Sequence, residues 1–203
     1  VIGNNYLESK NIIKASEIDF PKKLLYINPK QIQSNLIRNL SLESVSVNRQ
    51  IISKKLIINV LEREPVAYAK KIGGNGFEEG MIDQNAIWIP FSVSQEKLGR
   101  EIKLEVHGWR DDQREWISLI ILHQKNLGSP LLKIMLSPNG EINLQTKEFE
   151  LVRLGSNRNQ LKEQIRILSH LSKSLPSIFI NQPVSTIDLR DPSKPELQTP
   201  KDN

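Results

Sequence analysis

Apolar residues recur along this chain with two different periods, which indicates a mixture of strands and helices. Within residues 45–51, and again within residues 56–60, valine, isoleucine and leucine alternate with polar residues. A period of two is typical of a half-buried strand. Because only a few residues separate the two runs, they predict an antiparallel hairpin.

Two helices are predicted before this hairpin. The first covers residues 9–15, has a poor apolar pattern and would use Ser9 as its N-cap. The second begins at Asn28-Pro29, because asparagine caps helices and proline fits the first helical turn. Its predicted apolar face consists of Ile32, Leu36, Ile37 and Leu40.

The apolar pattern of the rest of the chain predicts mainly strands. They are predicted at residues 66–68, 81–83, 87–90, 102–106, 132–136, 142–144, 149–154 and 186–189. One helix is predicted from Asp111 or Asp112 to His123, with Trp116, Leu119, Ile120 and His123 sharing a face. The strongest helix pattern covers residues 157–175, and Pro176 is expected to end it.

These elements predict an α+β fold with two domains. Residues 1–70 would place two helices on a small mixed sheet, and residues 71–191 would form a mainly antiparallel β domain with helices on one face. Residues 192–203 contain three prolines. We expect them to form a flexible, extended tail unless a partner or a sheet edge holds them.

The amino-acid composition excludes several kinds of functional site. The chain has no cysteine, which excludes disulfides, thiolate nucleophiles and Cys-ligated metal sites. Its net charge is +5, but the basic residues are spread along the sequence in nothing longer than pairs such as Lys22-Lys23, Lys54-Lys55 and Lys70-Lys71. A solvated basic surface is therefore favoured over nucleic-acid binding.

The first residues suggest a fragment of a longer protein. The chain begins with Val1 rather than methionine, at what reads as the end of a strand, and it contains no signal peptide. It also has no apolar run of the roughly 20 residues that a membrane-spanning helix needs.

No catalytic constellation is visible. The three histidines lie far apart in the sequence, and none has a partner at metal-ligand spacing. Asp111-Asp112 suits a helix N-terminus, and Glu62 and Glu64 suit a solvated strand face. The glycines of residues 73–76 lack the lysine of a phosphate-binding loop and predict a hairpin turn instead. We therefore predict no catalytic, cofactor-binding or metal-binding residue.

One motif in the first half is specific. It consists of V-x-V-x-R at residues 45–49 and L-x-I-x-V-x-E-R-x-P-V-A at residues 56–67. It resembles the paired strands that end the POTRA domain of FtsQ/DivIB-type bacterial cell-division proteins. Gly3-Asn4 resembles the pair that follows the first POTRA strand, and residues 28–40 lie where the second POTRA helix belongs. The resemblance implies that residues 1–70 are a POTRA domain.

The second half is similar to the β domain of the same family. The similar motifs are Ile82-Asp83, Leu154-Gly155 and I-D-L-R at residues 187–190. The G-E-I-x-L-x-T stretch at residues 140–146 and the tail look most like the cyanobacterial branch. Two positions depart from the family pattern: Ser53 stands where a proline is usual, and Ala86 where a glycine is usual.

The resemblance implies a non-enzymatic scaffold without cofactors that recruits other cell-division proteins to the septum. Its partners would be divisome membrane proteins of the FtsB/FtsL type or their lineage-specific equivalents, together with weak self-association. A type II topology would follow, with one N-terminal transmembrane helix in the inner membrane and this chain in the periplasm at the division site. The alternative is a POTRA-containing component of outer-membrane assembly or secretion machinery, which would show several POTRA repeats; this chain shows one.

The resemblance also implies candidate partner-binding residues. The last strands of the β domain would offer an exposed edge to an added partner strand. The candidates are Thr186, Ile187, Asp188, Leu189 and Arg190 in the second half, and Arg49, Glu62 and Arg63 in the first. A purely structural explanation stays open for each, as sheet completion for the former and as cross-strand charge pairing for the latter.

Overall fold

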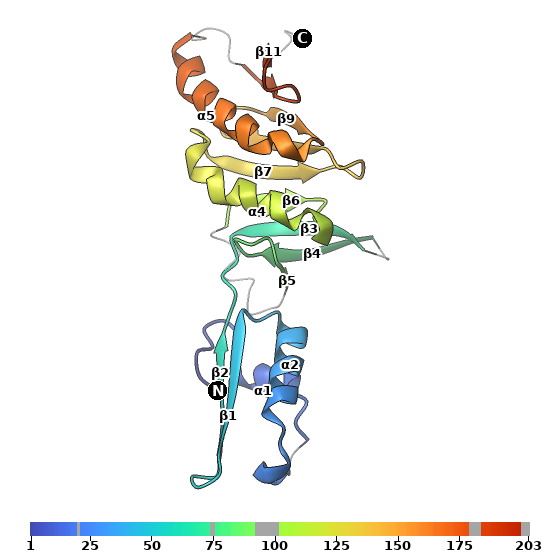
Figure 1. Cartoon of the computed structure of the whole chain (residues 1–203), viewed down its shortest axis with the longest axis vertical. Helices are drawn as coiled ribbons and strands as arrows, with labels where there is room; N and C mark the ends of the chain where they lie inside the picture. Colours follow the sequence, from blue (N-terminus) through green and yellow to red (C-terminus); the bar gives the residue numbers. More distant parts are fainter. Residues whose placement is uncertain (20, 74–75, 92–101, 179–183, 200–203) are drawn as a thin grey trace. The chain divides into compact units, whose positions relative to one another are not determined.

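The computed structural model describes residues 1–19, 21–73, 76–91, 102–178 and 184–199. The chain forms two compact units, the first built on Val1–Pro65 and the second on Val66–Ile87 and Ile102–Asn203. Figure 1 shows both, coloured along the sequence.

The first unit places two α-helices on one face of a small sheet (Figure 1). Its elements are α1 (Ser9–Ala15), the 3-10 turn η1 (Leu24–Tyr26), α2 (Pro29–Leu40), β1 (Ser44–Gln50) and β2 (Lys55–Leu61). β1 and β2 pair antiparallel with Val47 opposite Ile58. Ile2 adds a parallel bridge on the other side of β2, so the sheet is mixed, as predicted.

The core of this unit explains the helix patterns. Ile12 of α1 and Ile32 and Leu36 of α2 are buried with Val45 and Ile58 of the hairpin. Asn28 caps α2 as predicted, its side chain accepting a hydrogen bond from the Lys30 amide. Two details of the prediction are wrong: Ile37 is exposed, and the N-cap of α1 is Glu8 rather than Ser9.

The second unit is built on a nine-stranded mixed sheet with the order β11-β10-β9-β8-β7-β6-β3-β4-β5. The strands are β3 (Ala67–Gly73), β4 (Gly76–Ile82), β5 (Trp88–Pro90), β6 (Glu105–His107), β7 (Leu131–Leu136), β8 (Ile142–Thr146), β9 (Leu151–Gly155), β10 (Thr186–Asp188) and β11 (Glu196–Gln198). The helices are η2 (Asp111–Gln113), α4 (Arg114–His123), η3 (Gln124–Asn126), η4 (Arg158–Gln160) and α5 (Leu161–Ile178).

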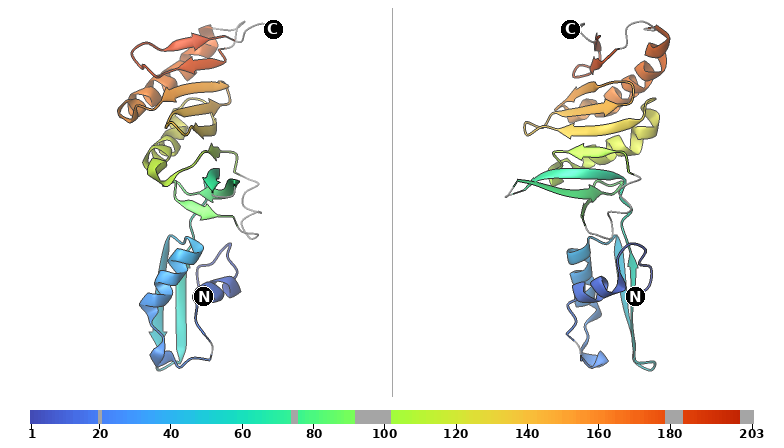
Figure 2. Two further views of the ribbon diagram at one scale, coloured as in Figure 1. Left: turned by 90° about the vertical axis from the view of Figure 1, so that its right-hand side faces the viewer. Right: turned by 180° about the vertical axis from the view of Figure 1, so that it is seen from behind.

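Helices α4 and α5 lie on the same face of this sheet, as Figures 1 and 2 show. α4 connects the parallel strands β6 and β7, and α5 connects the parallel strands β9 and β10. Antiparallel hairpins join β3 to β4, and β7 to β8 and β9. The α+β class and the single helical face are confirmed.

Helix prediction in this unit was partly wrong. The buried face of α4 consists of Ile117, Ile120 and Ile121; only Ile120 belongs to the predicted face. α5 continues past Pro176 to Ile178. Pro176 has no amide N–H to donate, so the helix loses one backbone hydrogen bond there, and only two residues follow the proline before the helix ends.

Ala86 stands where the FtsQ/DivIB family usually has glycine, and its backbone conformation explains that preference. Ala86 is buried and has a φ of 55°, in the left-handed region where glycine is favoured. Asp83 holds the turn, since its carboxylate accepts hydrogen bonds from the amides of Asn85 and Ile87, both at 2.9 Å. The indole N–H of Trp109 donates to the Ala86 carbonyl oxygen. An alanine is thus accommodated where the turn geometry suits glycine.

Candidate functional site

The C-terminal end of the large sheet is formed by β9, β10 and β11. β10 pairs parallel with β9 on one side and antiparallel with β11 on the other. The segment 192–203, expected to be mobile unless an edge holds it, thus supplies a strand that covers β10. Within the described residues, β11 and not β10 is the outermost strand at this end; the expectation of an exposed β10 edge is corrected in this respect.

The side chains of β10 divide between the two faces of the sheet. Ile187 and the following Leu189 are fully buried, and Ile187 is level with Val152 of β9. Asp188 is level with Arg153. The isoleucine and leucine therefore complete the core, and a partner at this edge would contact the main chain rather than these two side chains.

Asp188 is the centre of a charged cluster. Its carboxylate accepts from Arg190 at 2.6 and 3.0 Å, and Arg153 lies 3.7 Å away. The Asp188 side chain is 6% exposed, whereas that of Arg190 is 57% exposed. The hydrogen bond from Arg190 lowers the pKa of Asp188, against the opposing effect of burial. The arrangement fixes the chain direction at the end of β10.

A buried glutamine ties α5 to the same region. The Gln164 side-chain amide donates to the carbonyl oxygens of Leu154 at 2.7 Å and Leu189 at 2.8 Å. Leu154 lies within β9 and Leu189 directly follows β10, so both carbonyls are near the end of the parallel pair. Gln164 thus ties α5 to the main chain of both strands through two buried hydrogen bonds.

We expect the charge cluster to contribute stability in a pH-dependent way. Because the folded-state pKa of Asp188 is lowered, its contribution is present above the ordinary carboxyl pKa of about 3.9 and is lost as pH falls through the lower folded value. Asp188→Asn should lower the free energy of unfolding by about 1–2 kcal/mol at neutral pH. Urea unfolding at neutral and acidic pH measures this.

Asp112→Asn is the control, since Asp112 pairs with Arg110 at the surface, where ion pairs contribute little. A difference between wild type and Asp188→Asn that stays constant from neutral pH to about pH 3 would contradict the assignment.

Two of the candidate residues in the first unit have internal partners. The Arg49 guanidinium donates to the carbonyl oxygens of Leu25 at 3.0 Å and Ile27 at 2.9 Å. The Glu62 carboxylate accepts from the amides of Asn5, Tyr6 and Leu7, each at 3.0 Å. Their roles are to hold η1 and the N-terminal segment against the hairpin. The cross-strand pairing explanation is wrong for Arg49, which lies opposite Leu56.

Arg63 follows Glu62 directly, beyond the end of β2, and its side chain is half-buried. Arg63 and Glu62 are neighbours in the chain and belong to the first unit, whereas the β10 residues belong to the second unit.

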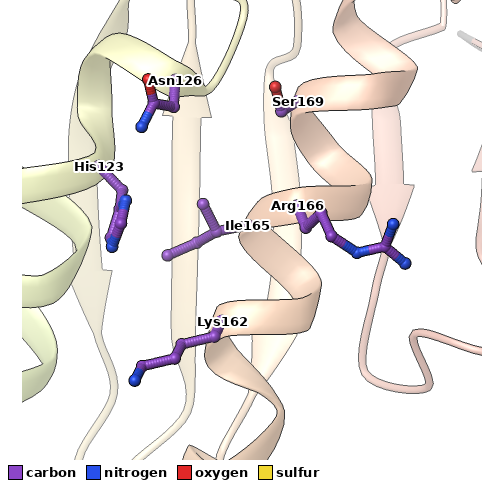
Figure 3. Close-up of a pocket in the computed structure, with 6 residues that line it drawn as sticks. All are labelled: His123, Asn126, Lys162, Ile165, Arg166 and Ser169. Carbon is purple, nitrogen blue, oxygen red and sulfur yellow. The ribbon is translucent and has the colours of Figure 1, made fainter.

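A pocket of about 310 Å³ lies between the end of α4 and α5 (Figure 3). His123 and Asn126 line it from one side, and Lys162, Ile165 and Ser169 line it from α5. Arg166 points away from the other five side chains in Figure 3 and pairs with Glu163. No acid–base pair or nucleophile–base pair occurs among these six lining side chains.

The described residues contain no group of three histidine, aspartate or glutamate side chains that could hold a metal ion. His107 contacts Glu105 at 2.9 Å, and Lys133 contacts the same carboxylate at 3.2 Å. In the part of the chain that the structure describes, no helix is both long and apolar enough to span a membrane.

Residues 1–63 match the family model described as POTRA domain, FtsQ-type. The chain carries an FtsQ-type POTRA domain. The match covers both helices and both strands of the first unit, and it confirms the resemblance to FtsQ/DivIB-type proteins. No curated protein matches this chain.

The geometry of the POTRA domain accounts for its motif residues. Gly3, with a φ of 85°, lies so close to β2 that a Cβ atom would be 2.3 Å from the Val60 carbonyl oxygen. Glu62 anchors the segment that follows Gly3. These motif positions therefore connect the N-terminal bridge, β2 and α1 within the FtsQ-type domain.

Sequence reasoning missed Arg153, Gln164 and β11. Arg153 alternates with buried residues in a predicted strand and carried no further signal. Gln164 interrupts the apolar stripe of a strong helix, and a polar residue that is buried in this way usually has a structural partner. β11 is short and follows Pro195, so its residues resembled a tail.

Proposed function

We propose that this protein is a non-enzymatic scaffold of bacterial cell division that binds other divisome membrane proteins. The observation that carries the proposal is the FtsQ-type POTRA domain at residues 1–63. FtsQ-type POTRA domains belong to a scaffold family rather than to an enzyme family. The match to the FtsQ type also favours cell division over outer-membrane assembly or secretion.

The same domain type supports a proposed location. The complete protein would be held in the inner membrane by a single helix that precedes the POTRA domain, with type II topology and with the described chain in the periplasm. Residues 1–70 would form the POTRA domain, 71–191 the β domain and 192–203 a C-terminal tail.

The proposed partner site is the β10 edge, Thr186 to Arg190. β11 covers this edge with only three residue pairs, and all three of its residues are exposed. Its removal therefore costs little buried apolar area. A strand from an FtsB/FtsL-type protein could replace it and gain a longer ladder of main-chain hydrogen bonds.

The hydrogen bonds of β10 identify the main-chain groups that the proposed partner would meet. The Ser185 carbonyl accepts from Leu151, and the Leu189 amide donates to Arg153, so these two groups face β9, whereas the Ser185 amide donates to Gln198 of β11. Alternation then turns the main-chain groups of Thr186 and Asp188 to the other side, toward β11. Arg49, Glu62 and Arg63 remain proposed as a second contact region in the POTRA domain.

Two variants test the edge in a pull-down from dividing cells, with captured FtsB/FtsL-type proteins measured by mass spectrometry. Thr186→Pro removes a main-chain donor on the partner side while leaving the bonds to β9, so capture should fall at least about tenfold. Truncation after Lys194 removes β11 and should raise capture severalfold.

Circular dichroism must stay native in both variants. Unchanged capture by Thr186→Pro would discard the edge proposal, and lost capture on truncation would show that the partner pairs with β11 instead.

A further inference from the structure

One end of the POTRA domain, formed by η1 and the β1–β2 turn, carries both basic and apolar side chains. We name residues 21–30 and 48–56 the basic tip. They hold six of the 28 lysine and arginine residues of the chain and none of its 23 aspartate and glutamate residues. The rest of the chain thus has 22 basic and 23 acidic groups, so the positive net charge comes from this tip.

The two segments are far apart in sequence but adjacent in space. Arg49 bonds the carbonyl oxygens of Leu25 and Ile27 and so fastens η1 to β1. Figures 1 and 2 show η1 and the β1–β2 turn at the same end of the first unit. The spread of basic residues along the sequence therefore conceals a cluster in the fold.

Large apolar side chains project from the same end. Ile52, at the turn, is fully exposed, and Ile51, Leu25 and Tyr26 are 56%, 65% and 71% exposed. Isolated exposed apolar residues need no explanation, but four within one basic cluster do. Burial of these side chains would release their hydration water, and the lysines around them would stay at a charged surface.

The β3–β4 hairpin provides a contrast. Ile72 and Phe77 are paired across β3 and β4 and are also exposed. There, Lys70 and Lys71 form ion pairs with Glu79 and Glu78. None of the ion pairs found among the described residues involves the tip lysines at positions 22, 23, 54 and 55, so their charge remains available to an anionic surface.

An apolar cavity of about 290 Å³ opens beside the tip. Its lining includes Lys22 and Lys54 with Leu24, Leu56 and Ile58. Val1 lines the same cavity. Since Ile2 runs parallel to β2, which starts at Lys55, the chain enters the domain from the tip end. An N-terminal anchor of the kind proposed above would therefore place the tip next to the bilayer; this step rests on the proposed function.

We propose that the basic tip inserts into the surface of an anionic phospholipid bilayer. Exposed isoleucine, leucine and tyrosine side chains enter the interfacial region, and the lysines bind lipid phosphates. A nucleic acid would engage the lysines but would offer no apolar layer for Ile51 and Ile52. The tip would thus act as a second membrane contact that orients the POTRA domain.

The test is co-sedimentation of the 203-residue chain with vesicles. Vesicles of phosphatidylglycerol and phosphatidylcholine in equal parts should bind the chain, and phosphatidylcholine alone should bind it much less. Lys54→Gln with Lys55→Gln should lower binding about 25-fold, because each lysine near an anionic surface contributes about fivefold. Ile51→Ser with Ile52→Ser should lower it about tenfold.

Ile72→Ser with Phe77→Ser is the matched control and should leave vesicle binding unchanged. Absence of binding, equal binding to both vesicles, or an equal loss in the control would overturn the proposal. The proposal would also be overturned if the isoleucine changes had no effect and an oligonucleotide bound in a lysine-dependent way. That result would indicate a surface that binds the phosphate backbone of a nucleic acid. The pull-down at the β10 edge is independent of these outcomes, so either proposal can fail alone.

Discussion

Replacement of Gly108 by alanine is expected to destabilise the large sheet by about 3 kcal/mol or more, from backbone strain together with a steric clash. Gly108 has a φ of 78°, and a Cβ atom there would lie 2.2 Å from the Leu136 carbonyl oxygen. That oxygen belongs to β7, so relief requires a shift of backbone rather than of a flexible side chain. The Gly108 amide also donates to Lys70 of β3.

Thermal unfolding of Gly108→Ala should show a fall in Tm of roughly 10 °C. Gly140→Ala is the matched control. Gly140 has a φ of 87°, but the atom nearest to an added Cβ, in the Arg158 side chain, would be 3.7 Å away. Gly140→Ala should cost only about 1 kcal/mol, the cost of the backbone conformation alone. Equal losses in the two variants would show that contact with Leu136 contributes nothing.

Replacement of Glu62 by alanine is expected to cost the POTRA domain about 2–4 kcal/mol, because three charge-assisted hydrogen bonds are lost together. The carboxylate accepts from the amides of Asn5, Tyr6 and Leu7. Two of these bonds are partly buried, so the released amides are not fully resolvated. The segment that leads into α1 should then open and exchange its amide hydrogens faster.

Urea unfolding and hydrogen exchange of residues 5–7 measure this effect. Glu64→Ala is the control, since Glu64 is exposed two residues further along the chain; it should change stability by less than about 0.5 kcal/mol. If Glu62→Ala and Glu64→Ala behaved alike, the anchoring role of Glu62 would be wrong. A loss of partner capture in a Glu62 variant must therefore be interpreted together with its stability.

Much of the fold could be predicted because its elements have local signals. The alternation in β1 and β2, and the Asn28-Pro29 start of α2, depend on residues near one another in sequence. The face of α4 was predicted less well, because isoleucines and leucines occur nearly all around that helix and only the position of the sheet selects Ile117, Ile120 and Ile121.

The candidate site was predicted less completely than the fold. The motif at residues 187–190 was correctly placed in a strand region, but its isoleucine and leucine are core residues. The cover provided by β11 could not be foreseen, because a three-residue strand has too little periodicity to be recognised. Main-chain amides and carbonyls also have no sequence signature, so the partners of Glu62 and Gln164 could not be predicted.

By itself, the sequence determined the order of helices and strands as far as β10, the α+β class and the FtsQ-type character of the first domain. Only the tertiary structure decided that Glu62 and Arg49 bind main-chain groups, that β11 covers β10 and that six basic residues gather at one tip. The physical reason is that local propensities act over a few residues. Contacts between distant segments instead depend on which surfaces the packed core brings together.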